Sequence, residues 1–215
     1  MAISHKHKLI FVHNPKCAGT SIINYFDMED WGHQHSVRLK KKYSEYWDEY
    51  KKFVVIRNPW DRFYSNYRYI KMEENYYHYN SSITAFKTPE LHPQNPNYKS
   101  GESGFYRKKR PLRAHFEFKD KTFEEYVDYF YYNMGETLDD VIITKLQKFF
   151  IHPEVKTIRF ENLEQELSNW LQKEIKLPTI NPSPSLTPSP YTPELVDKVE
   201  KIYLPDIKIL GYDRP

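Results

Sequence analysis

Three short segments of the chain have the hydrophobic pattern of β-strands. Residues 9–12 and 53–56 are unbroken apolar runs, as expected of central parallel strands that are covered on both faces. Residues 155–160 alternate apolar and polar side chains, as a half-buried strand does. The pattern predicts an α/β fold in which helices flank a mainly parallel central sheet.

Helical spacing follows each of these segments. Ile22, Ile23 and Phe26 predict a helix over about 20–26. Asn58 and Pro59 suit the cap and the first position of a second helix. Further helices are predicted after a capping box at 122–125, over 139–150, after 161–164 and after 192–193. With 215 residues, the chain is long enough for one domain with its own core, so we expect a single domain over 1–215.

Two stretches show neither the helical nor the strand pattern of apolar residues. Residues 71–119 are rich in Tyr, Asn, Ser, Pro and Lys, and a stretch of this length inside a compact domain is either functional or mobile. We interpret it as a lid or insertion over a substrate site, with a plain surface loop as the alternative. Residues 177–193 contain six prolines and are predicted to lack regular structure.

The segment between the first strand and its helix has the composition of an anion-binding loop. Lys16 supplies a positive charge, and Ala18 and Gly19 let a phosphate approach the backbone closely. Thr20 and Ser21 add hydroxyl groups where the helix begins. The N–H groups at a helix N-terminus have no intrahelical acceptors, and the helix dipole favours negative charge there. A strand, a loop and a helix with Gly-Thr is also common without a ligand.

This loop is not a Walker A sequence, in which the lysine follows the second glycine. The run Pro-Lys-x-Ala-Gly-Thr-Ser at 15–21, placed after an apolar strand, instead resembles the 5′-phosphosulfate loop of the sulfotransferases. The carbohydrate type and its bacterial relatives are the most similar. Their donor, 3′-phosphoadenosine 5′-phosphosulfate (PAPS), has phosphate groups at both ends of its ribose. The resemblance therefore implies a second anion site, on another strand followed by a helix.

Residues 53–67 meet that requirement. Arg57 ends the second apolar run, and a guanidinium group with a nearby hydroxyl suits a phosphate dianion. In the family this arginine and a serine of the next helix bind the 3′-phosphate, and they match Arg57 and Ser65. The Arg-Asn-Pro turn alone could be explained by helix capping. Because both motifs occur together, in this order and with this spacing, a chance match explains them less well than the resemblance to the family does.

The resemblance covers both ends of the chain, with residues 71–119 as the main departure. It implies a three-layer, P-loop-like sulfotransferase fold that transfers the sulfuryl group of PAPS to a hydroxyl acceptor, favoured by analogy to be a carbohydrate, and releases adenosine 3′,5′-bisphosphate (PAP). A Leu-Pro-x-x-Asn-x-Ser segment implies that Asn181 and Ser183 approach the nucleotide. The donor-binding residues implied in all are Lys16, Cys17, Ala18, Gly19, Thr20, Ser21, Arg57, Ser65, Asn181 and Ser183.

Catalysis needs a base that takes the proton of the acceptor hydroxyl, and histidine suits this role near neutral pH. Many relatives have a histidine between the two anion sites, followed by small residues and an arginine-containing helix. His35 matches that position best, and His33 is the second candidate. Some relatives use a glutamate, for which Glu29 is the nearest candidate. Lys16 is also a catalytic candidate, because its charge can neutralise the leaving phosphate and the sulfuryl oxygens.

Cys17 is the single cysteine, which excludes an internal disulfide. Lys16 and the helix N-terminus could lower the pKa of its thiol and make it reactive, but relatives usually have threonine or another small residue here, which favours a packing role. The nine histidines do not have the spacing of a metal site, so no metal is expected.

The charge is balanced, with 32 Lys and Arg against 29 Asp and Glu and a net charge of +3, which does not predict nucleic-acid binding. No apolar segment approaches the roughly 20 residues that span a bilayer, and the first residues do not resemble a signal peptide. A soluble, cytoplasmic protein is expected.

Two other functions remain open. A P-loop phosphotransferase would use a similar loop, but the chain has no Gly-Lys-Ser/Thr sequence and no obvious Walker B aspartate after an apolar strand. A non-catalytic module that binds nucleotide or glycan would keep both loops and lack the base. Turnover distinguishes that module from an enzyme.

Overall fold

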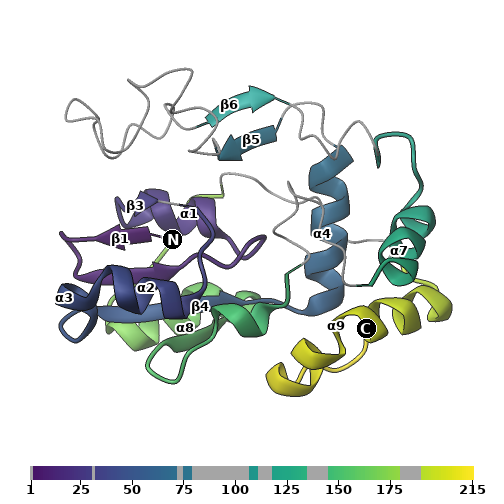
Figure 1. Cartoon of the computed structure of the whole chain (residues 1–215). Helices are drawn as coiled ribbons and strands as arrows, with labels where there is room; N and C mark the ends of the chain where they lie inside the picture. Colours follow the sequence, from purple (N-terminus) through teal and green to yellow (C-terminus); the bar gives the residue numbers. More distant parts are fainter. Residues whose placement is uncertain are drawn as a thin grey trace.

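The computed structural model describes residues 2–30, 32–71, 118–134, 145–179 and 190–215, and the backbone of 75–78 and 107–110. A five-stranded sheet has the strand order β3-β1-β2-β4-β7 (Figure 1). A separate two-stranded antiparallel sheet consists of β5 and β6. The strands are β1 Ala2–Ser4, β2 Leu9–Val12, β3 Glu29–Asp30, β4 Lys51–Ile56, β5 Asn75–His78, β6 Arg107–Arg110 and β7 Lys156–Arg159.

The three strands predicted from the apolar pattern are β2, β4 and β7, and they run parallel to one another. Their register pairs Phe11 with Phe53 and Val54 with Thr157. The strand β1 pairs antiparallel with both β2 and β3, so this edge of the sheet departs from the parallel arrangement. A mixed α/β fold with parallel strands at its centre is therefore confirmed, and the antiparallel edge is an addition.

Helices follow the central strands as the spacing predicted. The helices are α1 Gly19–Tyr25, α2 Ser36–Lys42, α3 Ser44–Trp47, α4 Pro59–Lys71, α7 Phe123–Tyr132, α8 Leu163–Leu171 and α9 Pro193–Leu210, with 3-10 turns η3 Gln147–Phe150 and η4 Phe160–Asn162. Because β2 and β4 are parallel, their carboxyl ends lie at the same edge of the sheet, and α1 and α4 both begin there.

Alternation along the central strands gives the sheet two buried faces. Phe11 and Phe53 pack with residues of α1 and α8, including Ile22 and Leu167. Residues of the opposite parity, such as Val54, pack with α2, α3 and η3. The unbroken apolar runs of β2 and β4 are thus explained by burial on both sides.

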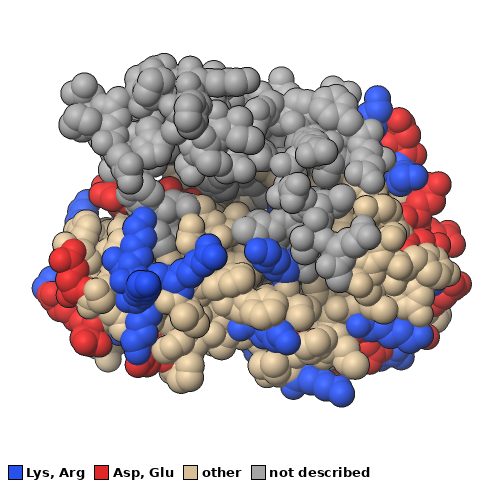
Figure 2. Space-filling view, in the orientation of Figure 1, with Lys and Arg blue, Asp and Glu red and all other residues tan. Residues whose placement is uncertain are grey.

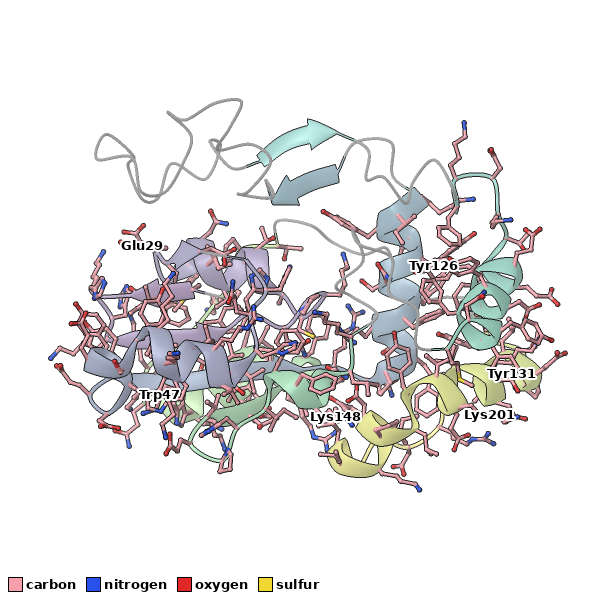
Figure 3. All side chains as sticks on the ribbon, in the orientation of Figure 1. Glu29, Trp47, Tyr126, Tyr131, Lys148 and Lys201 are labelled. Carbon is pink, nitrogen blue, oxygen red and sulfur yellow. The ribbon has the colours of Figure 1, made fainter. Side chains whose placement is uncertain are left out.

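A third core lies beside the sheet, between α4, α7 and α9 (Figure 1). Tyr126 of α7 lies between α7 and α4 in Figure 3, and its hydroxyl accepts a hydrogen bond of 2.8 Å from Asn66 Nδ2. We call this the aromatic cluster, whose buried aromatic residues are Trp60, Phe63, Phe118, Phe123, Tyr126, Phe130 and Tyr203.

One predicted helix differs from the structure. The helix expected over 139–150 is wrong for its described part, because Leu146 is extended (ψ 138°) and only the 3-10 turn η3 follows. The last helix continues past Pro205 to Leu210, with non-helical backbone at Tyr203. The capping box at Thr122 and Glu125 is confirmed. Most of the proposed lid at 71–119 lies outside the described residues.

No helix in the described ranges has the length and apolar character required to cross a membrane.

Candidate active site

The first anion loop, residues 13–18, joins β2 to α1 with an unusual backbone. Lys16 and Ala18 have positive φ values of 61° and 59°, which are uncommon for residues with a side chain. Ala18 caps α1, and its methyl side chain makes no capping hydrogen bond to this helix N-terminus. The first N–H groups of α1 therefore have the orientation that an anion requires.

Gly19 is required by a close approach of His13. A Cβ atom at position 19 would lie 1.9 Å from His13 Nε2, far inside any van der Waals contact. The His13 ring stacks on Phe11 and faces Asp30, with Nδ1 3.3 Å from Asp30 Oδ2. His13 thus lies directly over the first turn of α1.

Lys16 extends over the ring of Tyr69, with Nζ 3.8 Å from the ring centroid. Burial and the positive charge of Arg57 lower the pKa of Lys16 from 10.5 to about 7. A group with this pKa gains or loses its charge near neutral pH, so it responds strongly to a nearby anion.

The second anion loop, Arg57 and Asn58, follows β4 and begins α4. Arg57 is only 8% exposed, and its Nη1 donates a hydrogen bond of 3.2 Å to the carbonyl oxygen of Lys16. Its guanidinium group lies 4.3 Å from the centroid of the Phe160 ring. Burial lowers the pKa of Arg57, and its Nε has no hydrogen-bond partner among the residues that the structure describes. The two loops predicted from separate motifs are therefore in direct contact.

Ser65 is buried near the middle of α4, on the helix that begins immediately after Arg57. Asp61 lies between them on this helix, and burial raises the pKa of its carboxyl group, opposed by the charge of Arg57. The local pattern that placed Ser65 in a helix after the second loop is thus correct.

Buried polar residues that the sequence did not indicate support both loops. Arg62 is 1% exposed and donates from Nε to Pro15 O (3.0 Å) and from Nη2 to Lys145 O (3.1 Å). Gln147 is fully buried and bonds to Asn14 and Arg57. A buried Arg or Gln is unusual, but nothing in local periodicity identifies it, because its partners are distant in the sequence.

The two candidate histidines lie in different surroundings. The ring of His33 is 4.0 Å from that of His13, and His33 Nδ1 is 2.9 Å from the carbonyl oxygen of His13. His35 instead stacks on Phe149 at 5.3 Å and contacts Phe150 edge-on. Burial, together with Lys145 and Arg38, lowers the pKa of His35. The structure thus brings His33, and not His35, next to the residue that covers the first turn of α1.

Glu29, the alternative base, lies on the edge strand β3 (Figure 3). At the end of α2, burial lowers the pKa of Lys42 and the charge of Glu29 opposes this shift, whereas burial and the charges of Glu29 and Asp30 raise the pKa of Tyr43. The contact of β3 with His13 comes from the neighbouring Asp30.

Cys17 has the packing role. Its side chain is fully buried in the core with α1 and α8, and burial raises the pKa of its thiol to about 11. Among the described residues, no cluster of His, Cys, Asp and Glu has the arrangement of a metal site. Asn181 and Ser183 lie outside the described residues.

The face shown in Figure 2 carries small groups of Lys and Arg, with Asp and Glu mainly toward its two sides. This distribution agrees with the small net charge of +3.

The fold is that of an α/β protein in which two loops meet at the carboxyl ends of two parallel strands. A model of the sulfotransferase family matches residues 1–213. The chain therefore belongs to the sulfotransferase family, which makes it a transferase of sulfuryl groups with a hydroxyl-bearing acceptor. No curated protein and no solved structure matches it.

Proposed function

We propose that the protein transfers the sulfuryl group of PAPS to a hydroxyl of a carbohydrate acceptor. The observation that carries the choice of donor is the hydrogen bond from Arg57 Nη1 to Lys16 O, because it unites the two anion loops in one site. A nucleotide with phosphate groups at both ends of its ribose is a ligand that needs two such loops together.

The surroundings of Arg57 fit a phosphate group. A buried cation is costly unless an anion pairs with it, and no carboxylate of the described residues forms an ion pair with Arg57. Its Nε also lacks a hydrogen-bond partner. A 3′-phosphate would supply both the negative charge and the acceptor.

These positions support a set of donor-binding roles. Gly19, Thr20 and Ser21 at the start of α1 would hold the 5′-phosphate through backbone N–H groups and hydroxyls. Arg57 and Ser65 would hold the 3′-phosphate, and Lys16 would stabilise the negative charge that develops on the leaving phosphate. PAPS supplies the sulfuryl group that is transferred. The assignments of Asn181 and Ser183 to the nucleotide remain predictions.

The hydrogen bonding of His33 favours it over His35 as the base. A carbonyl oxygen can only accept a hydrogen bond, so His33 Nδ1 must carry the proton that points to His13 O. In the neutral ring, Nε2 then has the lone pair that can take the proton of an acceptor hydroxyl. The contacts of the two rings therefore reverse the order of preference that the sequence suggested, and both assignments remain open to the same experiment.

The acceptor class rests on family analogy, since the acceptor-facing lid proposed at 71–119 is largely outside the described residues. The rival proposal, a module that binds the nucleotide without turnover, predicts the same donor affinity and no reaction.

Calorimetric titration with PAP, with adenosine 5′-phosphate and ATP as controls, tests the donor site first. A clear preference for PAP is expected, and a screen of sugar acceptors with labelled PAPS then tests turnover. Preference for ATP, or no binding of any of the three, would contradict the proposal. Tight PAP binding with no transfer to any acceptor would favour the non-catalytic module.

A further inference from the structure

Gln147 forms hydrogen bonds with both peptide groups of Arg57. The backbone N–H of Arg57 donates to Gln147 Oε1 at 3.0 Å, and Gln147 Nε2 donates to the carbonyl oxygen of Arg57 at 2.8 Å. The backbone pairing of β4 with β7 ends at Ile56, so Arg57 lies just beyond the sheet. A carboxamide has one donor group and one acceptor group, which lets it replace a neighbouring strand at this point.

The same carboxamide reaches the first anion loop. Asn14 Nδ2 donates to Gln147 Oε1 at 2.9 Å and to Val55 O at 2.9 Å. Asn14 follows β2 and precedes Lys16 by two residues, so this contact joins the ends of β2 and β4. Both Asn14 and Gln147 are fully buried, where every such hydrogen bond has a high energetic weight.

A carboxylate on the last helix holds Gln147 in turn. Asp206 of α9 accepts from the backbone N–H of Gln147 at 2.6 Å and from that of Lys148 at 3.0 Å. These are the first two N–H groups of η3, which have no acceptor inside the turn itself. Asp206 thus fixes the start of η3, and with it the origin of the Gln147 side chain.

We infer that Gln147 is a positioning residue that holds the 3′-phosphate-binding Arg57 in register with the Lys16 loop, and that Asp206 supports it from α9. This inference rests on the proposed function. Without the carboxamide, the peptide groups of Arg57 lose partners on both sides, and the guanidinium group loses its fixed position relative to Lys16. Loss of the carboxamide should therefore reduce the contribution of the 3′-phosphate to the binding of PAP.

The test compares affinity for PAP with affinity for adenosine 5′-phosphate in Gln147→Met, which keeps the length of the side chain and removes both hydrogen-bonding groups. The ratio of the two affinities is expected to fall roughly tenfold or more, as for loss of a hydrogen bond to a charged group. Asp206→Asn keeps one acceptor oxygen for the two N–H groups and should lower the ratio by a smaller factor. If Gln147→Met does not fold, Asp206→Asn decides the question.

Two controls separate positioning from general stability. Val199→Ala removes fully buried side-chain volume from α9 and should lower the melting temperature without changing the ratio. Gln165→Met alters an exposed glutamine of α8 and should change neither the melting temperature nor the ratio of affinities. If Gln147→Met and Asp206→Asn lower the melting temperature but keep the wild-type ratio, Gln147 is only structural and the inference is wrong. Failure of the wild-type protein to bind PAP would instead overturn the proposed function, and this inference with it.

Discussion

The anion loops and the aromatic cluster are built on opposite principles, although α4 belongs to both. In the loops, Lys16 and Ala18 have positive φ values, and the buried Arg57 has a nitrogen without a partner. In the aromatic cluster, Phe63 packs against four other rings, and the neighbouring α7 begins with a complete capping box. Two residues with positive φ and an unsatisfied guanidinium nitrogen thus lie where a ligand is expected, and the well-packed cluster supplies stability that tolerates them.

The largest effect is expected at His33, whose loss should affect chemistry without affecting stability. His33→Ala removes the proposed base and should lower turnover about 10²- to 10⁴-fold while PAP affinity is retained. Steady-state assays with labelled PAPS, together with calorimetry, measure the two quantities. His35→Ala is the matched control, and a loss of turnover in His35→Ala alone would restore the order of preference predicted from the sequence.

Phe63→Ala should have the opposite signature. Its ring contacts Phe123, Tyr126, Phe130 and Tyr203, so its removal leaves a cavity at the centre of the aromatic cluster. The free energy of unfolding in urea should fall by about 3–5 kcal/mol. At a temperature where the variant is folded, its preference for PAP over adenosine 5′-phosphate should equal that of the wild type. A changed preference would mean that the two regions are not independent.

Arg57→Ala tests the unpaired charge directly. PAP binding should weaken by roughly 1.5–3 kcal/mol, the value of a hydrogen bond to a charged group, while binding of adenosine 5′-phosphate changes little. Because the variant also removes a buried cation without an ion-pair partner, its unfolding free energy should fall far less than that of Phe63→Ala. Equal losses of affinity for the two nucleotides would contradict the assignment of Arg57 to the 3′-phosphate.

Lys16 should give an effect of a different kind, a change of affinity with pH. Its pKa is about 7 in the free protein, and a bound phosphate favours the charged form, so binding takes up a proton above pH 7. PAP affinity should fall by roughly tenfold per pH unit from pH 7 to 9 and level off below pH 7. Lys16→Arg, which stays charged, should remove this slope, as calorimetry across the range would show.

The free energy of unfolding should change with pH in the opposite direction to PAP affinity, and it should rise as the pH rises. Since its pKa in the folded protein lies below the unfolded value of 10.5, the unfolded chain binds more protons between these values. The contribution of Lys16 to the stability of the free protein therefore rises with pH through this window and is lost as pH falls through 7. Urea unfolding of the wild type and Lys16→Met at pH 6.5 and 9 measures this difference; equal pH dependence in both proteins would rule out a lowered pKa.

The sequence was sufficient where a signal is local. The apolar runs of β2 and β4, the residues of the two anion loops and the capping box of α7 are each contained within a few neighbouring positions. The strand β1 was missed because three residues carry no periodicity and it forms only through pairing with β2 and β3. The choice between His33 and His35 was also beyond a local pattern, because it depends on contacts with His13 and Phe149 from other elements.

The error at 139–150 has a similar cause. Apolar spacing suggested a helix, but Asp206 bonds to the N–H groups at the start of η3 from 59 residues away. A contact of that separation outweighs the local preference for a helix and fixes a short 3-10 turn with an extended residue before it. The same long-range contact places Gln147 beside Arg57, and no sequence motif predicts this position of Gln147.

The position of Asp206 on α9 has a consequence for the order in which the protein is made. Both anion loops and Ser65 lie within the first 65 residues, and they leave the ribosome long before α9 does. A nascent chain folds its N-terminal part first, yet the carboxylate that fixes Gln147 is synthesised among the last residues. A ribosome-bound chain arrested before residue 206 would therefore carry every side chain proposed to bind the donor, and the proposed nucleotide site would still be loosely ordered.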